Sequence, residues 1–282
     1  MLDTVTTKEG YINLSDVKDI PHPELFDMVA KVIAEDNLQE VNRHSKTGVP
    51  RRSFYTKYGK RWVDILFSFV ALVITAPINL IIAIITFFDV GKPILFKQVR
   101  VGKDGQIFEI TKFRNMTNET DEHGVLLPPH LRVTKWGKFV RKTSLDELLN
   151  FWSVLKGDMS LIGPRPLLID YLEVYSDRHK MRHAVRPGLE CPALHPNNKR
   201  ATWTDQFEND IEYVENVSFL LDVKMAFALV RMVIDRKDTA VRSSAQRGSF
   251  MGYNRDGTSI DSQNVPMIYY EKAIERIKKA GR

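Results

Sequence analysis

The chain has 282 residues, 43% of them hydrophobic and 27% charged, and its formal net charge is +6. This composition allows a sizeable buried core, and it excludes both a disordered chain and a protein with many membrane spans. The excess of Lys and Arg favours partners that carry phosphate, such as lipid headgroups, nucleotides or nucleic acid. The single cysteine, Cys191, excludes an internal disulfide and is typical of a reducing compartment.

Residues 1–56 are mostly polar and carry no pattern that indicates a chemical function. Within them, residues 24–41 place apolar side chains at helical spacing, which predicts one amphipathic helix. We therefore interpret residues 1–56 as an N-terminal extension and linker.

The most apolar stretch is residues 62–88, and its length meets the roughly 20 apolar residues that a membrane-spanning helix needs. Length alone therefore favours a single transmembrane helix. Pro77 lies in the middle of the stretch, where its ring removes a backbone donor and clashes with the preceding turn. Each half then has about a dozen residues, which cover about half of the hydrocarbon thickness at the helical rise.

Basic residues flank this stretch on both sides, with Lys60 and Arg61 before it. The positive-inside rule then places both ends in the cytoplasm. A helix-break-helix hairpin that enters and leaves the same leaflet satisfies the length, the proline and the charges together. Backbone groups freed at the break need hydrogen-bond partners, and Thr75 and Asn79 are the nearest candidates.

Several further segments have recognisable patterns. Residues 94–113 alternate around a Lys-Asp-Gly turn and predict a β-hairpin. Residues 145–155 place Leu and Trp side chains on one face of a helix that ends at Gly157. Residues 131–142 mix basic and aromatic side chains, which fits a segment on an anionic membrane surface and equally an ordinary solvated helix. Further helices are predicted for residues 167–184, 218–235 and 267–279, and residues 237–282 as a whole are interpreted as a peripheral C-terminal tail.

Asp146 and Glu147 are the candidate catalytic pair. Ser144 followed by Glu147 fits a capping box, in which carboxylates at a helix N-terminus have a purely structural role. The same position suits a nucleophile, because the helix N-terminus favours an ionised Asp146 that can attack phosphorus. Glu147 could then hold Mg²⁺, which proteins usually bind with one or two carboxylates together with substrate phosphates. The pattern leaves both interpretations open.

Basic residues would complement such a pair, since phosphoryl transfer depends mainly on positioning and on neutralising charge. Arg165 is the strongest candidate, because Pro164 and Pro166 restrain its backbone and would preorganise a bidentate contact with phosphate. Each of the others, taken singly, is more typical of a solvated surface charge. These other candidates for binding the substrate are Lys112, Arg114, Arg141 and Arg186.

In their order along the chain these motifs resemble the bacterial sugar transferase family, the small monotopic phosphoglycosyl transferases. The resemblance covers about residues 57–236, and such an ordered series is far more specific than a lone Asp-Glu pair. It rests on the apolar run around Pro77 and on the motifs Lys60-Arg61-Trp62-Val63-Asp64, Phe96-Lys97-Gln98-Val99-Arg100-Val101-Gly102, Lys112-Phe113-Arg114, Ser144-Leu145-Asp146-Glu147-Leu148, Leu155-Lys156-Gly157-Asp158-Met159-Ser160, Ile162-Gly163-Pro164-Arg165-Pro166-Leu167 and Val185-Arg186-Pro187-Gly188. A later match consists of Phe207, Asp210 and Tyr213, followed by Leu221-Asp222-Val223-Lys224.

The resemblance implies an α+β fold, helix-rich around a small sheet, with a re-entrant membrane hairpin and interfacial amphipathic helices. It implies a phosphoglycosyl transferase at the cytoplasmic face of the cytoplasmic membrane that moves a hexose-1-phosphate from a UDP-sugar to undecaprenyl phosphate. Asp146 would attack the β-phosphate and release UMP, and the covalent sugar phosphate would then pass to the lipid. Glu147 would bind Mg²⁺, while Lys112, Arg141 and Arg165 would bind phosphates or the nucleotide. The implied partners are a UDP-sugar, undecaprenyl phosphate and membrane lipids.

Two departures from the family pattern bear on these expectations. The family usually has Ser before the hairpin proline, where this chain has Ala76, and Thr75 is then the nearest hydroxyl. After Arg-Pro-Gly the family commonly has Thr-Gly, whereas this chain continues with Leu189-Glu190-Cys191. Because that loop is a candidate for substrate contact, the sequence leaves the identity of the hexose open.

Two other classes of protein fit parts of the pattern. A non-enzymatic adaptor with one spanning helix would explain residues 62–88 but gives no role to the Arg165 loop. A nucleic-acid-binding protein would explain the charge, but the chain has no recognition motif for nucleic acid. The sequence therefore favours the enzyme and predicts no nucleic-acid partner. It leaves open the pathway, whether the protein forms a homo-oligomer, and the roles of residues 1–56 and 237–282.

Overall fold

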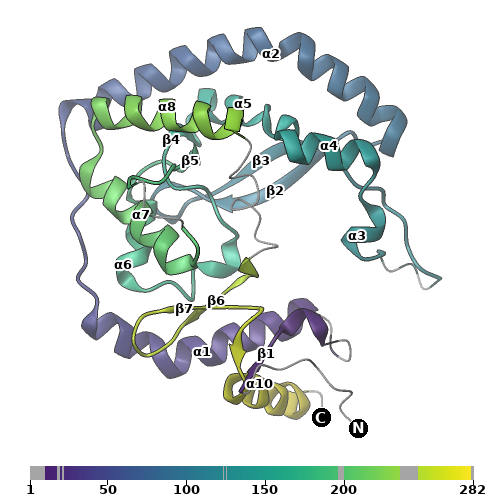
Figure 1. The fold of residues 1–282 in the computed structure, drawn as a ribbon, viewed down its shortest axis with the longest axis vertical. Coiled ribbons are helices and arrows are strands. Elements are labelled where there is room, and N and C mark those ends of the chain that lie inside the picture. The colour runs from purple at the N-terminus through teal and green to yellow at the C-terminus, as the bar shows by residue number, and fades with distance from the viewer. Residues whose placement is uncertain are drawn as a thin grey trace. The chain divides into compact units, whose positions relative to one another are not determined.

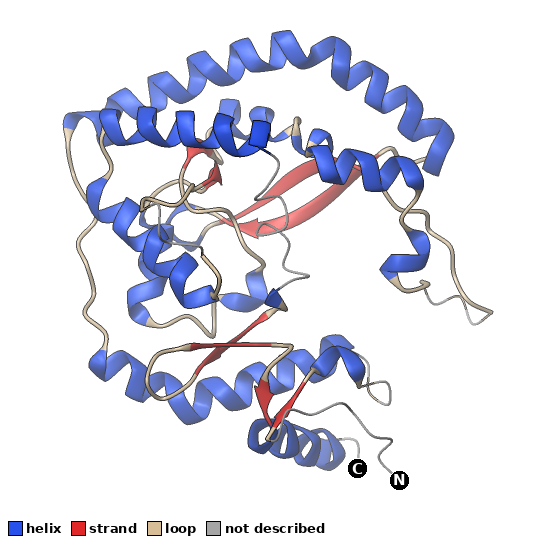
Figure 2. Cartoon of the chain, in the orientation of Figure 1, coloured by secondary structure: helices blue, strands red, loops and turns tan. Residues whose placement is uncertain are grey.

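The computed structural model describes residues 10–280 apart from 18–19, 21, 123, 125, 196–199 and 236–246 (Figure 1, Figure 2). The chain divides into two compact units. The central unit comprises residues 52–166 and 186–190, and the flanking unit comprises residues 1–51, 167–185 and 191–282. Helices and small two-stranded sheets make up both units, which confirms the predicted α+β class.

The central unit begins with a π-helical turn, Tyr55–Gly59, that leads into the long helix α2, Lys60–Val90. The predicted break at Pro77 does not interrupt the helix: α2 continues through it, and Figure 1 shows one arched helix. Proline removes a single backbone donor, and a helix can respond by bending instead of ending. The Thr75 hydroxyl donates to the Ala71 carbonyl oxygen at 2.7 Å and so adds a hydrogen bond in the turn before Pro77.

The outer surface of α2 is apolar, whereas the side chains that it buries are mostly polar. Its buried residues are Asp64, Ser68, Ile82 and Thr86. Large apolar side chains are exposed instead, with Phe88 81% and Trp62 72% accessible. A helix on the surface of a water-soluble protein has the reverse arrangement, so this surface suits hydrocarbon. With the turn that precedes it, α2 is the one helix in the described part of the chain that is long and apolar enough to cross a membrane.

A β-hairpin follows α2, as the sequence predicted. Strands β2, Leu95–Val101, and β3, Ile107–Phe113, pair antiparallel. Ile110 of β3 packs in a buried core cluster with Val154 and Met159. The remaining elements of the central unit are helices α3, Pro129–Arg132, α4, Lys135–Thr143, and α5, Asn150–Lys156, and the parallel strand pair β4, Ser160–Ile162, and β5, Gly188–Glu190.

Two side chains near the start of α2 fix this helix to the rest of the central unit. The Arg61 guanidinium donates to two carbonyl oxygens in the last turn of α5, each at 2.6 Å. Asp64 accepts hydrogen bonds from the Ser160 hydroxyl and the Leu161 amide, both at 3.0 Å. Arg61, predicted as a cation at the membrane flank, therefore also has a packing role.

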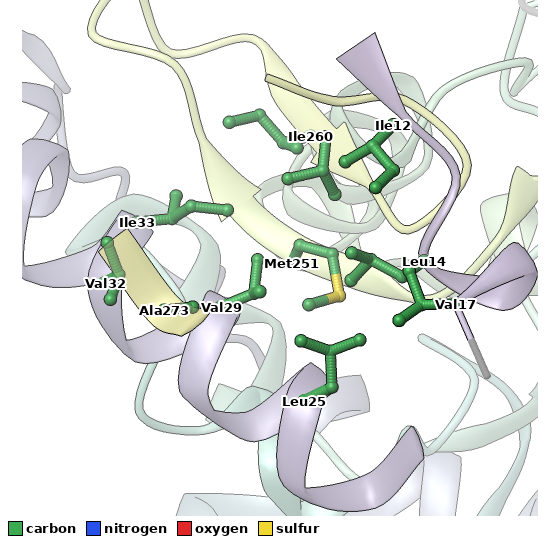
Figure 3. Close-up of a cluster of buried hydrophobic side chains, with 11 residues drawn as sticks. Ile12, Leu14, Val17, Leu25, Val29, Val32, Ile33, Met251, Ile260 and Ala273 are labelled. Carbon is green, nitrogen blue, oxygen red and sulfur yellow. The ribbon is translucent and has the colours of Figure 1, made fainter. Parts of the chain in front are cut away.

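In the flanking unit, residues from both ends of the chain share one hydrophobic core (Figure 3). Helix α1, His22–His44, confirms the helix predicted for residues 24–41 and contributes Leu25 and Val29 to this core. Met251 and Ala273 also contribute to this core, although they belong to residues 237–282, for which the sequence predicts a peripheral tail. That tail is instead part of a packed core, because its apolar residues cover the apolar face of α1. Its elements are β6, Phe250–Tyr253, β7, Ser259–Asp261, β8, Val265–Pro266, which pairs with β1, Tyr11–Ile12, and the predicted last helix, α10, Met267–Ala280.

The helix predicted for residues 167–184 is wrong. Ser176 has an extended backbone, and its side chain accepts a hydrogen bond from the His179 amide, so a new helix begins here. The segment therefore consists of short pieces, Ile169–Tyr171, α6, Asp177–Lys180, and Met181–Ala184. The flanking unit also contains α7, Trp203–Asn216, and α8, Phe219–Asp235, which confirms the helix predicted for residues 218–235.

Candidate active site

Asp146 and Glu147 lie in one tight turn between two helices. Helix α4 ends at Thr143 and is capped by Ser144, whose backbone is left-handed with a φ of 57°. A 3₁₀ turn, Leu145–Glu147, follows before α5 begins at Asn150. The Ser144 side chain makes no capping hydrogen bond, so the predicted capping box is wrong. The reason is that the Glu147 side chain binds basic groups instead of the backbone.

Two cations hold Glu147. Its Oε1 accepts hydrogen bonds from Lys112 Nζ and from Arg165 Nη2, both at 2.6 Å. Burial disfavours its charged form, but the charges of Arg165 and Lys112 outweigh burial and lower the pKa of Glu147 to about 2. The charge of Glu147 in turn raises the pKa of Arg165. The structure thus brings together three residues that separate sequence motifs had singled out.

Asp146 lies in a different environment from its neighbour. It is 6% exposed and accepts a hydrogen bond from Asn115 Nδ2 at 3.0 Å. Burial, reinforced by the charge of Glu147, raises the pKa of Asp146 to about 6, although Lys112 and Arg141 oppose the shift. Burial also lowers the pKa of Arg141, whose charge interacts with Asp146. Such a carboxylate is more basic and less solvated than an ordinary aspartate, which favours attack on an electrophile.

The Gly-Pro-Arg-Pro loop holds Arg165 against strand β5. Arg165 Nη1 donates to the Leu189 carbonyl oxygen at 3.1 Å. The Gly188 amide donates to the Pro164 carbonyl oxygen at 3.0 Å. Glycine is needed for this approach, because a Cβ on Gly188 would lie 2.1 Å from the Gly163 nitrogen. The loop and β5 therefore form one packed unit that fixes the guanidinium beside the carboxylate pair.

Two of the predicted substrate-binding arginines contact backbone carbonyls. The Arg114 guanidinium donates to the carbonyl oxygens of residues 90–92 and thereby caps the C-terminal end of α2. Arg186 Nε donates to the Gly157 carbonyl oxygen at 2.8 Å, just beyond α5. Both side chains therefore stabilise the scaffold of the central unit.

Asn115 is a site residue that no sequence motif indicated. It follows the Lys112-Phe113-Arg114 motif directly, and this position in the sequence is the only feature that could have indicated a role at the site. Its carbonyl oxygen packs against α4 so closely that a Cβ on Gly137 would lie 2.0 Å from it. Gly137 therefore lets α4 approach the residue that donates to Asp146. An Asn after a strand is more often a turn residue, which is why the sequence alone did not distinguish it.

The carboxylate pair fits a hard divalent cation in its chemistry. Within the described ranges, no three His, Cys, Asp or Glu side chains gather as a preformed metal centre. Mg²⁺ does not need one, because it usually keeps several waters and takes one or two carboxylates together with substrate phosphates. Asp146 and Glu147 can supply those oxygens, and Glu147 would then exchange a cationic partner for the metal.

The central unit thus combines the buried Asp146 carboxylate, the half-buried Glu147 carboxylate, a fixed guanidinium and a lysine with a helix of apolar outer surface. This combination is typical of proteins that handle phosphorylated substrates at a membrane. The sequence model of the family described as bacterial sugar transferase matches residues 55–236. The chain belongs to the bacterial sugar transferase family.

Relatives with known names agree with this assignment. The chain is 43% identical to the uncharacterized sugar transferase EpsL of Bacillus subtilis (strain 168), over 62% of this chain and 87% of that protein. It is 37% identical, over 62% of its length, to the UDP-N-acetylgalactosamine-undecaprenyl-phosphate N-acetylgalactosaminephosphotransferase of Aeromonas hydrophila. The UDP-glucose:undecaprenyl-phosphate glucose-1-phosphate transferase of Klebsiella pneumoniae is also 37% identical, over 61% of this chain. The chain spans only 43% and 39% of the lengths of these last two proteins.

Proposed function

We propose that this protein transfers a hexose-1-phosphate from a UDP-sugar to undecaprenyl phosphate, with Asp146 as the nucleophile and UMP as the leaving group. One observation carries the proposal: Asp146 is buried with a pKa raised to about 6, while two cations hold its neighbour Glu147 at 2.6 Å. The names of the A. hydrophila and K. pneumoniae relatives, which specify undecaprenyl phosphate, support the same class of reaction.

In the first half-reaction an Asp146 carboxylate oxygen attacks the β-phosphorus of the UDP-sugar. A bond forms between this oxygen and the phosphorus, the bond to the bridging oxygen breaks, and that oxygen leaves with UMP. The sugar phosphate stays on Asp146 as a mixed anhydride. With a pKa of about 6, Asp146 is mostly ionised at neutral pH, so no base has to remove a proton first.

In the second half-reaction an oxygen of undecaprenyl phosphate attacks the same phosphorus. The bond between that phosphorus and the Asp146 oxygen breaks, which restores the carboxylate and leaves the sugar on a lipid diphosphate. Both halves need positive charge beside the phosphorus, and Lys112, Arg141 and Arg165 supply it. The Asn115 amide orients the Asp146 carboxylate through its hydrogen bond at 3.0 Å.

Glu147 would hold Mg²⁺ together with oxygens of the diphosphate, and the bound cation would supply charge neutralisation as UMP leaves. When Glu147 faces the cation, Lys112 and Arg165 can donate to phosphate oxygens instead. Their ion pairs with Glu147 therefore keep both side chains where the phosphates bind.

We further propose that α2 is re-entrant, with both of its ends on the cytoplasmic side of the cytoplasmic membrane. Both ends are bonded to the same compact unit, through Arg61 at the start and Arg114 at the finish. A helix that crossed the bilayer would carry one of its ends about 30 Å away from that unit. The arched course of α2 in Figure 1 and its apolar outer surface support the same path.

Topology can be tested with single cysteines near Arg52 and near Lys103, introduced after Cys191 is replaced. In inside-out membrane vesicles a membrane-impermeant maleimide should label both positions, and in right-side-out vesicles it should label neither. Labelling of the two positions from opposite sides of the membrane would contradict the re-entrant path and favour the single-span adaptor.

The reaction can be tested with the full chain in lipid nanodiscs containing Mg²⁺. UMP release is measured for UDP-glucose, UDP-galactose, UDP-N-acetylglucosamine and UDP-N-acetylgalactosamine, with and without undecaprenyl phosphate. We expect one burst of UMP per protein without the lipid, sustained release with it, and an added sugar phosphate on Asp146 in peptide mass spectra. No UMP and no adduct with any of these donors would overturn the proposal.

A further inference from the structure

Glu190 is a second carboxylate beside Arg165, in addition to Glu147, and the proposed mechanism does not use it. It is the last residue of β5 and is 5% exposed. Its Oε2 lies 3.8 Å from Arg165 Nη1, while Arg165 Nη2 donates to Glu147 at 2.6 Å. The charge of Glu147 foremost, and that of Glu190 after it, raise the pKa of Arg165 against the effect of burial. Arg165 therefore bridges two carboxylates.

The backbone of Glu190 is bonded to the loop that carries Arg165. The Gly163 amide donates to the Glu190 carbonyl oxygen at 3.2 Å, and Ile162 pairs with Glu190 in the parallel strand register. The Leu189 carbonyl oxygen accepts a further bond from Arg165 Nη1. The Glu190 carboxylate and the guanidinium are thus mounted on one packed unit, and their separation does not depend on the turn that carries Glu147.

This arrangement matters at the moment when Glu147 changes partner. Once Glu147 faces a metal or a substrate phosphate, Arg165 loses its partner at 2.6 Å. A long side chain without a fixed counter-charge has several rotamers available, and ordering it again costs free energy. Glu190 lies beside Nη1 of the guanidinium, whereas Glu147 lies beside Nη2. Glu190 can therefore keep Nη1 in place while Nη2 donates to a phosphate oxygen.

We propose that Glu190 is a positioning residue that holds Arg165 in its phosphate-binding orientation after Glu147 has released it. The inference rests on the proposed function, because it assigns Arg165 to the phosphates of the UDP-sugar. It is specific to Glu190 as a charge: Gln fills the same space but does not supply the counter-charge.

The test is a double-mutant cycle on the full chain in nanodiscs, with the wild type, Glu190→Gln, Arg165→Lys and the double variant. Glu190→Gln should lower kcat for UMP release about tenfold in the wild-type background and change it less than about twofold when Arg165→Lys is already present, because coupled residues are not additive. The affinity of all four proteins for UDP-glucose and for UDP-N-acetylgalactosamine is also measured in the presence of Mg²⁺. These affinities give a second double-mutant cycle, which compares binding instead of kcat.

Glu109→Gln is the matched control, since it removes the same charge from an exposed ion pair with Lys97 and should leave kcat unchanged. The inference would be overturned if Glu190→Gln lowered kcat by the same factor in the wild-type and in the Arg165→Lys background, or if it had no effect on kcat in the wild-type background. If the wild type releases UMP but the effects of the two substitutions are additive, the role of Glu190 is refuted and the proposed function stands. A wild type that neither releases UMP nor binds these donors defeats the proposed function, and the inference falls with it.

Discussion

The two units each bury charged side chains, but they balance those charges differently. In the flanking unit Arg182 and Asp210 are 2% and 1% exposed, and Arg182 donates to Asp210 Oδ2 from Nε at 3.1 Å and from Nη2 at 2.7 Å. Arg182 Nη1 donates to the Tyr175 hydroxyl at 3.3 Å, and the guanidinium lies 5.5 Å from the centre of the Phe207 ring. The two buried charges of this ion pair therefore neutralise each other.

In the central unit Lys112 and Arg165 both bind Glu147, whereas Asp146 accepts its hydrogen bond from the uncharged Asn115 amide. One carboxylate therefore has a pKa of about 2, while its neighbour has a pKa of about 6. A carboxylate whose charged form is disfavoured adds nothing to the stability of a fold at neutral pH. The comparison teaches that burial of charge does not by itself mark a chemical site, whereas an uneven distribution of counter-charge does.

The largest effect expected from this comparison is that of Asp146→Asn. Without the nucleophile no covalent adduct can form, so UMP release should fall at least about a thousandfold. The melting temperature should stay within a few degrees of the wild type or rise, because the change removes a buried charge. UMP release and thermal unfolding are measured side by side, with Asp104→Asn in an exposed turn as the control. Near-normal turnover in Asp146→Asn would refute the assignment of the nucleophile.

Asp210→Asn should have the opposite profile. It leaves the buried Arg182 charge without its carboxylate, and breaking a buried pair by removing one partner costs about 3–5 kcal/mol of stability. Because Asp210 belongs to the flanking unit, UMP release per folded molecule should stay close to that of the wild type below the melting transition. Denaturant unfolding measures the first effect, and turnover at low temperature measures the second. If Asp210→Asn abolished turnover and left the free energy of unfolding unchanged, the Arg182 and Asp210 pair could no longer be distinguished from the Asp146 and Glu147 site by its role.

The parts of this molecule that the sequence predicted well are those with a regular local pattern. The helix at residues 24–41, the hairpin at 94–113 and the helix at 218–235 follow directly from the spacing of apolar side chains. The motifs also pointed to Lys112 and Arg165, which the structure brings to the Glu147 carboxylate.

The features that the sequence did not predict depend on contacts between distant residues. Ser144 and Glu147 have the spacing of a capping box, but the cations of Lys112 and Arg165 attract the Glu147 side chain more strongly than a backbone amide does. Nothing local in the sequence shows that Arg114 caps α2. The shared core of the two chain ends also has no local signature, since its halves lie more than 200 residues apart in the sequence.

Glu147→Gln should sharpen the contrast within the carboxylate pair. The substitution removes the charge that would hold Mg²⁺ and that keeps Lys112 and Arg165 in position, so kcat should fall roughly tenfold to a hundredfold, about 1.4–2.8 kcal/mol. The Mg²⁺ concentration for half-maximal UMP release should rise, and chelation with EDTA should abolish release in both the variant and the wild type. Titrations of UMP release with Mg²⁺ check this, again with Glu109→Gln as the control. An unchanged Mg²⁺ dependence would place the metal on other ligands.

The smallest effect is expected at Glu208 of the flanking unit, which accepts hydrogen bonds from Arg178 and His179. Burial opposes its charge, but these two partners outweigh burial and lower the pKa of Glu208 from 4.5 to about 2. A carboxylate whose pKa is lower in the folded state adds stability above the unfolded pKa, and this stability is lost as the pH falls from 4.5 towards 2. Because Glu208 is 41% exposed, solvent screening reduces its contribution to about 1 kcal/mol.

Glu208→Gln should therefore lower the free energy of unfolding by about 1 kcal/mol at pH 7 and by much less at pH 3, with UMP release unchanged. Denaturant unfolding at the two pH values measures the difference, and Glu40→Gln, in an exposed pair on α1, provides the control. A gap between variant and wild type that is as large at pH 3 as at pH 7 would show that Glu208 acts through packing. The balanced charge at Glu208 would then be a consequence of the fold of the flanking unit and not a source of its stability.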